Sequence, residues 1–348
     1  MHPHADDLYA TAGDDRTARV WSFGKRRQVA AVGVPCAARA VAWWQPEPGS
    51  GGGGSVASWA APGPSYLAVG LGKAGDELAG AGSGTVVLFE HVEGGDAKPD
   101  ALRAACRTPD TGRAAVTELK VAPAAAGAFP RLAVGAADGG ICVLELLPGG
   151  AGGAEPAVRL ECFFDLSAHE RDTLKLAPAA VAHFDWSSAG EFLQTNTADG
   201  ELRFWEVPKL ANFVQDDGSV ADDLGDGKTE SLKQTRPSKL VFEQWQSWTC
   251  PLGWPVQGCW RGGGGEINAV HRAPGAGKYL ATAGDASKVS VYYYPVVSKG
   301  AKSVDLEAHA GAVANVRWRG ADPGGAMNLV SVGATDRGVF VWRLLKHS

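Results

Sequence analysis

Hydrophobic and polar residues alternate over short stretches of the chain, and the same arrangement recurs along its length. Residues 8–23 read LYATAGDDRTARVWSF: a run of small residues, a polar turn, and an alternating stretch that ends near a bulky residue. Alternation with a period of two is typical of half-buried β-strands, and polar residues between two such runs favour a tight turn. The arrangement predicts a β-hairpin. It returns in five further segments, of which the first is the weakest copy: 77–91, 131–146, 184–208, 279–295 and 329–344.

A short apolar strand is predicted to precede these hairpins. The stretches that fit it are 40–44, 116–123, 181–187, 267–274 and 313–318. A unit of this kind that repeats every ~40–45 residues is typical of WD-repeat β-propellers, in which each unit forms a four-stranded blade. The bulky residues that end the hairpins lie farther apart, which indicates WD-like units separated by insertions: Trp21, Phe89, Leu144, Trp205, Tyr292 and Trp342. We therefore predict an all-β fold, a WD-repeat β-propeller of about six to seven four-stranded blades.

The whole chain, residues 1–348, is predicted to form a single propeller domain interrupted by loops. Clusters of Gly, Pro and acidic residues indicate three inserted loops, at 46–65, 148–156 and 209–240. The few residues at either end of the chain supply too few strands to close a ring. We therefore expect an incomplete or open ring that belongs to a longer chain, or whose edges a partner covers.

Several hairpins carry a polar set with regular spacing. In one of them Thr195 lies on the first strand, Asp199 in the turn and Trp205 on the second strand, and His169 lies upstream. In WD repeats such residues form a hydrogen-bonded chain inside the blade, which satisfies buried polar groups. The matching residues are Thr11, Asp15 and Trp21 in the first hairpin, and His309, Asp336 and Trp342 in the last, where Ser331 is offset by one position. An Asp–His pair also suggests a catalytic dyad, but in this register we expect a structural role.

Composition adds limits on the class of protein. The 348 residues are 45% hydrophobic and include 12 Trp, 47 Gly and 20 Pro, which favours a turn-rich, well-packed chain over a disordered one. A net charge of −5 gives no indication of binding to nucleic acid or to a membrane surface. The sequence contains no apolar run of the ~18 residues that a membrane span needs. Its first residues, MHPHADDLYA, do not resemble a secretory signal.

Motifs for catalysis or for cofactor binding are not found. The six cysteines form no CxxC pair and no cluster with zinc spacing, so we expect free thiols of a cytosolic protein: Cys36, Cys106, Cys142, Cys162, Cys250 and Cys259. There is no GxSxG elbow, no phosphate-binding GxxxxGK[ST] loop and no HExxH motif. We therefore predict a protein that is not an enzyme and that needs no metal or cofactor.

Two stretches are more specific than a general WD repeat. FDWSSAGEFLQTNTADGELRFWEVP, residues 184–208, and WTCPLGWPVQGCWRGGGGEINAVHRAPGAGKYLATAGDASKVSVYYYP, residues 248–295, resemble two successive blades of the echinoderm microtubule-associated protein-like family. The stretch HAGAVANVRW, residues 309–318, is similar to the start of that family's final blade. The resemblance covers most of the chain in order. It implies the second of two tandem propellers.

The resemblance implies a non-catalytic cytoskeletal protein that associates with tubulin or microtubules. The expected location is the cytoplasm and cytoskeleton, including the axoneme of a cilium. A general WD-repeat adaptor that scaffolds another multiprotein complex is the alternative. A propeller hydrolase would need a convergent set of catalytic side chains, and no such motif is present. Neither nucleic acid nor membrane is expected as a partner.

Three surface features are candidates for partner contact. Lys25, Arg26 and Arg27 form a basic cluster after the first hairpin, and such a cluster either contacts an acidic surface or is simply solvated. The acidic stretch at 215–230 is expected to be a solvated loop or a docking arm. Trp254, between Gly253 and Pro255, either packs within a blade or lies in a contact surface.

Overall fold

The computed structural model describes the backbone over thirteen ranges of the chain. These are residues 1–2, 7–45, 64–72, 85–94, 99–108, 114–123, 131–148, 158–165, 179–207, 233–260, 266–275, 277–321 and 326–344. The chain divides into two compact units. The first unit contains residues 2–199 and 203–244, and the second contains residue 1 together with residues 200–202 and 245–348.

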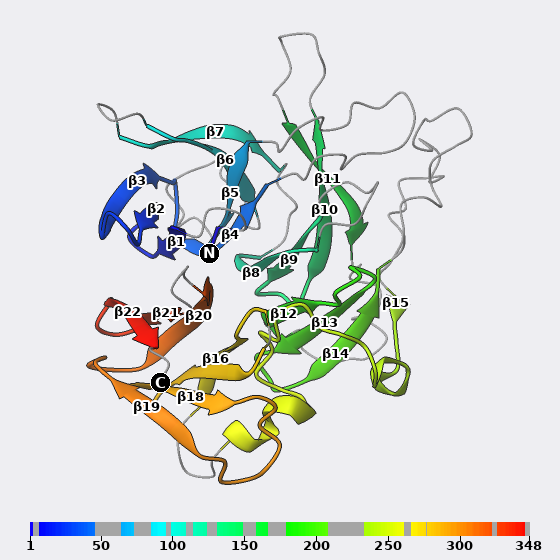
Figure 1. Ribbon diagram of the computed structural model, residues 1–348. Coiled ribbons are helices and arrows are strands. Elements are labelled where there is room, and N and C mark those ends of the chain that lie inside the picture. The colour runs from blue at the N-terminus through cyan, green and yellow to red at the C-terminus, as the bar shows by residue number, and fades with distance from the viewer. Residues whose placement is uncertain are drawn as a thin grey trace. The chain divides into compact units, whose positions relative to one another are not determined.

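The first unit contains four antiparallel sheets within the described ranges, each built from strands that are consecutive in the chain (Figure 1). The first sheet has the order β1–β2–β3, with β1 Leu8–Gly13, β2 Thr17–Ser22 and β3 Arg27–Gly33. The second has β4 Ala38–Trp44, β5 Ser65–Leu71, β6 Val86–Val92 and β7 Ala101–Arg107. The third has β8 Val116–Val121, β9 Arg131–Ala136, β10 Ile141–Pro148 and β11 Val158–Asp165. The fourth has β12 Val181–Trp186, β13 Phe192–Thr197, β14 Leu202–Glu206 and β15 Lys233–Gln234.

The second unit contains two further sheets in its described residues. The fifth sheet has β16 Ile267–Arg272, β17 Tyr279–Gly284, β18 Lys288–Tyr293 and β19 Ser303–Glu307. The sixth has β20 Val313–Ala321, β21 Met327–Gly333 and β22 Val339–Leu344. Two short 3-10 helices are also described, η2 Pro237–Leu240 in the first unit and η3 Trp254–Cys259 in the second. No helix in the described ranges is long and apolar enough to cross a membrane.

The strands predicted before the hairpins are the first strands of their sheets. β4, β8, β12, β16 and β20 coincide with the five predicted stretches to within a few residues. The second sheet differs from the prediction, because β6 pairs with β5, at Ser65–Leu71, and the residues at 73–84 lie outside the described ranges. β5 is buried along nearly its whole length, so it reads as a continuous apolar run and shows no alternation.

The three predicted loops lie largely outside the described residues. Of 46–65, the described end contributes Ser65 to β5, and of 148–156 it contributes Pro148 to β10. Of 209–240, the described end forms β15 and η2. The acidic stretch at 215–230 also lies outside the described ranges.

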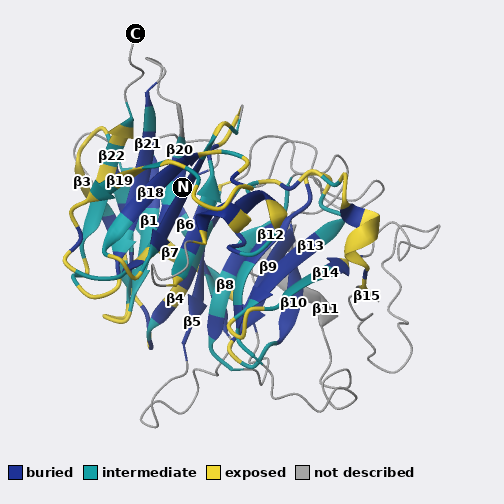
Figure 2. Cartoon of the chain, turned by 90° about the horizontal axis from the view of Figure 1, so that it is seen from below, coloured by how far each residue is buried: buried dark blue, intermediate teal, exposed yellow. Residues whose placement is uncertain are grey.

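Within each unit, successive sheets pack face to face. In the first unit β4 lies against β8 and β8 against β12, and in the second β16 lies against β20. The facing side chains form one apolar cluster for each pair of neighbouring sheets, and the largest fully buried side chains include Trp44, Trp186 and Trp318. Figure 2 shows this burial along the strands and the exposure of the turns. Full burial of one such side chain contributes about 1.5–3 kcal/mol of hydrophobic free energy.

Glycines on the second strands set how closely neighbouring sheets approach. A Cβ on Gly70 of β5 would lie 2.4 Å from Cγ1 of Val116 on β8. A Cβ on Gly135 of β9 would lie 2.8 Å from Cγ1 of Val181 and 2.9 Å from the Phe184 ring on β12. At these two positions glycine is therefore required by packing against the following sheet.

We expect Gly70→Ala to destabilise the protein by about 1–3 kcal/mol, because the added methyl overpacks a full core. Gly33→Ala is the matched control, since a Cβ at Gly33 meets no atom within 4 Å. Urea unfolding followed by tryptophan fluorescence measures both changes. Equal stability of the two variants would contradict the packing argument.

Candidate functional site

Three hairpins hold the indole of a tryptophan against a hydroxyl on the neighbouring strand. Trp21 Nε1 donates to Thr11 Oγ1 at 2.9 Å, and Trp205 Nε1 donates to Thr195 Oγ1 at 3.1 Å. In the first hairpin Thr11 lies directly opposite Arg19, and Trp21 is two residues farther along the same strand. Such diagonal neighbours on one face of a sheet are within reach of a long side chain.

The turn aspartates of the first and fourth sheets accept hydrogen bonds from residues of their own hairpins. Asp15 accepts hydrogen bonds from Thr17 Oγ1 at 2.7 Å and from Arg19 Nη2 at 2.6 Å. The hydrogen bond from Thr17, followed by that from Arg19, lowers the pKa of Asp15. Asp199 accepts a hydrogen bond from Thr197 Oγ1. Both carboxylates therefore bind residues of their own hairpin.

The expected partner of Asp199, His169, lies outside the described residues. The first hairpin offers no matching histidine in the predicted set. The carboxylate-to-imidazole link that the sequence predicts is therefore described in the sixth sheet alone.

In the sixth sheet the predicted chain of polar contacts is complete. Trp342 Nε1 donates to Ser331 Oγ at 2.8 Å, and Ser331 Oγ also lies 2.8 Å from His309 Nε2. His309 Nδ1 lies 3.0 Å from Asp336 Oδ2. Hydrogen bonds from the backbone amides of Gly338 and Ala310, and then from His309, lower the pKa of Asp336. The spacing from Ser331 to Trp342 is one residue longer than in the other hairpins, and Ser331 still lies diagonally opposite Trp342 because it pairs with Phe340.

The order Asp336–His309–Ser331 matches that of a hydrolytic triad, but its burial favours a structural role. Ser331 is fully buried and the His309 side chain has no exposed surface. A catalytic serine must reach the reacting atom of a substrate, and this hydroxyl is enclosed between the imidazole and the indole. The arrangement holds β21, β22, the turn between them and the segment before β20 together.

Ser331→Ala should lower the free energy of unfolding by about 1–3 kcal/mol, because the half-buried indole of Trp342 and the buried imidazole of His309 lose their shared partner. Ser298→Ala, at an exposed serine of the same unit, should change it by less than about 0.5 kcal/mol. Thermal unfolding with calorimetry compares the two. A neutral Ser331→Ala would show that the contact adds nothing to stability.

The fifth sheet has no tryptophan at the diagonal position, and a different carboxylate joins its strands. Thr282 lies diagonal to Tyr292 and donates to the carbonyl of Ser290 at 3.5 Å. On the outer strand β19, Asp305 accepts hydrogen bonds from Lys288 Nζ at 2.6 Å and from the hydroxyls of Ser290 and Ser303 at 2.7 Å. Burial raises the pKa of Asp305, but the hydrogen bonds from Lys288, Ser303 and Ser290 outweigh it and lower the pKa to about 2.

The lowered pKa of Asp305 predicts how its contribution depends on pH. The folded state favours the carboxylate, so the stabilisation is complete above the ordinary pKa of about 4 and is lost as the pH falls towards 2. Asp305→Asn should therefore be less stable than the native protein near pH 6, and the difference should shrink as the pH is lowered towards about 3. Thermal unfolding across this range measures it. A difference that stays constant or widens would contradict the assignment.

The basic cluster predicted from the sequence lies on a well-defined turn. Lys25 and Arg26 connect β2 to β3, Arg27 begins β3, and all three are exposed. Asp7 caps this turn by accepting hydrogen bonds from the amide of Gly24 and from Ser22 Oγ. No described carboxylate forms an ion pair with the three basic side chains. We call Lys25, Arg26 and Arg27 the basic turn.

Three aromatic rings pack against one another next to the basic turn. Tyr9 lies 4.7 Å from Phe23 and 6.2 Å from Trp21, measured between ring centroids, and the amide of Phe23 donates to the carbonyl of Asp7 at 2.8 Å. The charges are therefore carried by a turn of fixed geometry.

Trp254 begins η3 in the second unit, and 62% of its surface is exposed. Three further apolar side chains of the same region are also exposed: Trp260, Tyr293 and Val297. We call these four residues the aromatic surface. The sequence indicated Trp254 as a candidate contact residue because tryptophans are dense around it. It did not indicate Tyr293, because the sequence of its strand does not differ from that of the other predicted strands.

A family model described as the echinoderm microtubule-associated protein second β-propeller matches residues 1–344. The chain belongs to this family. Together with the six antiparallel sheets, the match confirms the predicted all-β, WD-repeat β-propeller fold and the resemblance seen in the sequence.

Curated relatives of the echinoderm microtubule-associated protein family match about half of the chain. The like-3 protein of Homo sapiens is 30% identical over 167 residues, 47% of this chain and 16% of that protein. The like-1 protein of Rattus norvegicus is 32% identical over 167 residues, 47% of this chain and 17% of that protein. The like-4 protein of Xenopus tropicalis is 28% identical over 168 residues, 48% of this chain and 15% of that protein. The match spans less than a fifth of the length of each of these relatives.

The solved structures that align with this chain have lower sequence identity than the curated relatives. The Cps50 (Swd1) β-propeller domain of Myceliophteria thermophila aligns with 97% of this chain and 80% of its own, at 12% identity and a TM-score of 0.39. Sqt1 of Chaetomium thermophilum, bound to the N-terminus of the ribosomal protein L10, aligns with 97% of this chain and 72% of its own, at 14% identity and a TM-score of 0.41. The family assignment therefore rests on the family model.

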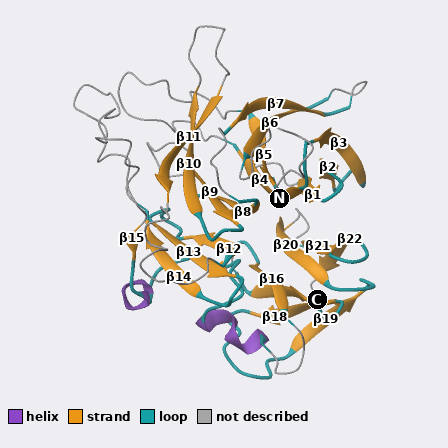
Figure 3. Cartoon of the chain, turned by 180° about the vertical axis from the view of Figure 1, so that it is seen from behind, coloured by secondary structure: helices purple, strands orange, loops and turns teal. Residues whose placement is uncertain are grey.

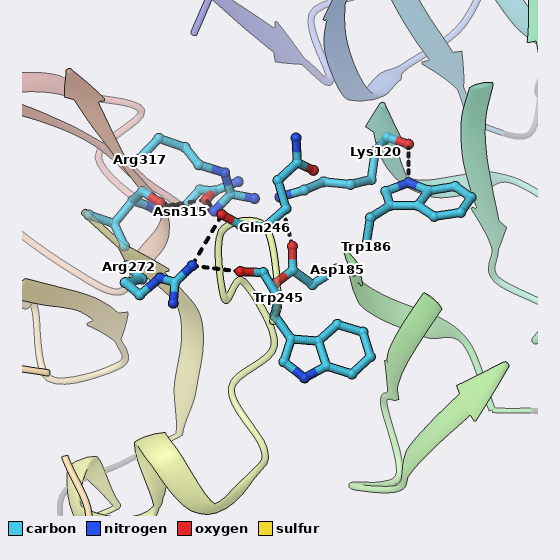
Figure 4. A network of polar contacts seen from close by, with 9 residues as sticks. Lys120, Asp185, Trp186, Trp245, Gln246, Arg272, Asn315 and Arg317 are labelled. Carbon is cyan, nitrogen blue, oxygen red and sulfur yellow. Dashed lines mark hydrogen bonds and ion pairs between the residues drawn. The ribbon is translucent and has the colours of Figure 1, made fainter. Parts of the chain in front are cut away.

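The structure gives a physical role to the Asp-Trp-Ser run of this echinoderm microtubule-associated protein propeller. Asp185 is fully buried with its Oδ1 3.7 Å from Lys120 Nζ, and Trp186 Nε1 donates to the Lys120 carbonyl at 3.0 Å (Figure 4). Ser187 Oγ accepts hydrogen bonds from the amides of Glu191 and Phe192 at 3.1 and 3.0 Å. The run joins the third sheet to the fourth and caps the turn that follows β12.

The Ile-Asn-Ala-Val-x-Arg run has a corresponding role in the second unit. Asn268 Nδ2 donates to Asp285 Oδ1 at 2.9 Å and to the Val313 carbonyl at 3.0 Å, which ties the fifth sheet to the sixth. Arg272 Nη2 donates to the carbonyls of Trp245 and Gln246 at 2.6 and 3.3 Å (Figure 4). It thereby anchors the segment that leads to η3.

The described part of the chain contains no group of three or more His, Cys, Asp or Glu side chains that could hold a metal ion. Five of its cysteines are described as free thiols, and four of these are buried. Burial raises the pKa of Cys106 to about 11 and also raises that of Cys36, so both thiols stay protonated near neutral pH.

Proposed function

We propose that this chain is a non-catalytic, microtubule- or tubulin-associated component of the cytoskeleton, located in the cytoplasm. Its membership of the echinoderm microtubule-associated protein family supports the proposal. So do the names of its curated relatives, which describe them as microtubule-associated. A role in the axoneme of a cilium is the finer form of the same proposal.

The basic turn is the observation that best supports a binding site for a partner. Lys25, Arg26 and Arg27 are exposed on a turn that Asp7 caps, and no described carboxylate neutralises them. Uncompensated positive charge on a fixed turn attracts an acidic protein surface, and the attraction weakens as salt is added. We propose that the basic turn contacts an acidic surface of tubulin.

Co-sedimentation of the 348-residue chain with assembled microtubules tests this proposal. The variant with Lys25→Glu, Arg26→Glu and Arg27→Glu should bind about tenfold more weakly at low salt, because exposed charge pairs each contribute up to about 1 kcal/mol. Added salt should weaken the native protein more than the variant.

The matched control carries the same change in net charge at exposed positions outside the basic turn: Arg236→Glu, Lys239→Glu and Lys302→Glu. This control should bind more tightly than the basic-turn variant. Native protein that stays in the supernatant at low salt would refute microtubule association and would leave the general WD-repeat adaptor as the function to test. Equal loss in both variants would refute the basic turn as the contact.

A further inference from the structure

The aromatic surface of the second unit presents large apolar groups to solvent. The exposed fractions are 75% for Tyr293, 62% for Trp254, 38% for Val297 and 37% for Trp260. Clustered exposed aromatics are typical of contact sites, and Trp and Tyr are the residues most often found at binding hot spots. Trp254 begins η3 and Trp260 follows it, while Tyr293 ends β18 and Val297 lies in the segment after it. Figure 3 shows η3 in purple near β18.

Backbone contacts hold the two segments in register. The amide of Val296 donates to the Pro255 carbonyl at 2.7 Å, and the amide of Gly258 donates to the Val296 carbonyl at 2.7 Å. Gln257 Nε2 donates to the Val297 carbonyl at 3.1 Å. A Cβ on Gly258 would lie 2.5 Å from the Ser298 carbonyl oxygen, so the close approach requires glycine.

The aromatic rings themselves are also constrained. Gly253, the residue before η3, has φ +126, and a Cβ there would lie 2.6 Å from the Trp248 ring. Only glycine fits this position, which fixes the backbone where η3 begins. Trp260 Nε1 donates to the Pro251 carbonyl at 2.9 Å, and the Tyr293 ring lies 5.3 Å from that of Tyr279. A surface that is ordered before binding loses little conformational entropy when a partner docks.

Two exposed lysines lie close to the aromatic surface along the chain or across a backbone hydrogen bond. Lys278 and Lys299 are exposed and form no ion pair with a described residue, and the amide of Tyr294 donates to the Lys278 carbonyl. Residues 245–260 contain no Asp or Glu. On the neighbouring strand, Asp305 is already bound by Lys288 and two serine hydroxyls. The lysines beside the rings are therefore not neutralised locally.

We propose that the aromatic surface, with Lys278 and Lys299, binds an extended acidic peptide segment of a partner protein. The rings would contact apolar side chains or the peptide backbone, and the two ammonium groups would bind carboxylates. An anionic membrane fits less well, because each basic residue contributes only about 1 kcal/mol at a membrane surface and two are present. The inference goes beyond microtubule association and does not depend on the basic turn.

Fluorescence anisotropy of a short labelled peptide of glutamates interspersed with phenylalanines tests the site on the full 348-residue chain. The native protein should bind this peptide and should not bind the version in which lysines replace the glutamates. Trp254→Ala should weaken binding about tenfold or more, and the double variant Lys278→Glu with Lys299→Glu by about tenfold at low salt.

Phe242→Ala is the matched control, because Phe242 is 93% exposed and lies in the other unit. It should bind the acidic peptide like the native protein, as should the basic-turn variant, which separates this site from the proposed microtubule contact. Thermal unfolding verifies that Trp254→Ala is folded. Equal affinity for the acidic and the basic peptide, unchanged affinity in Trp254→Ala, or binding to anionic vesicles in place of the peptide would each overturn the proposal.

Discussion

The close approach of one sheet to the next is the constraint on which the rest of this propeller depends. Gly70 and Gly135 place bare backbone against Val116 and Val181, leaving no room for a Cβ. That approach permits one apolar cluster between each pair of neighbouring sheets within a unit. Because a single sheet cannot bury its own faces, each sheet is stable only through its neighbours.

Polar groups join the same sheets where apolar packing ends. The indole of Trp342, the hydroxyl of Ser331 and the imidazole of His309 satisfy one another in a buried chain that ends on Asp336. Such a chain specifies one arrangement, since any other leaves a buried donor or acceptor without a partner. The fifth sheet carries Tyr292 in place of the tryptophan, and Asp305 there joins β18 to the outer strand β19.

The two candidate contact surfaces differ in their physical character. The basic turn is charged and acts at long range, so its effect depends on salt. The aromatic surface acts at short range, through exposed rings on a backbone that Gly253 and Gly258 constrain. Both lie on connections and at the ends of strands, whereas the inner parts of the strands are committed to packing.

The sequence by itself determined five of the six hairpins, the first strands of five sheets to within a few residues, and the spacing between tryptophan and hydroxyl. These follow from local rules: alternation gives strands, polar runs give turns, and a spacing of ten or eleven residues places a tryptophan diagonal to a hydroxyl. The family motifs in residues 184–295 also identified the family.

The tertiary structure decided what local rules cannot reach. β5 is buried on both faces and shows no period, so only its pairing with β6 reveals it. Whether Asp15 binds its own hairpin or an imidazole depends on which groups lie within hydrogen-bonding distance in space. The structure also decided which side chains are exposed and so belong to the candidate contact surfaces. Tyr293 lies on the same strand as the buried Tyr292, but it is the last residue of that strand and its ring is exposed to solvent.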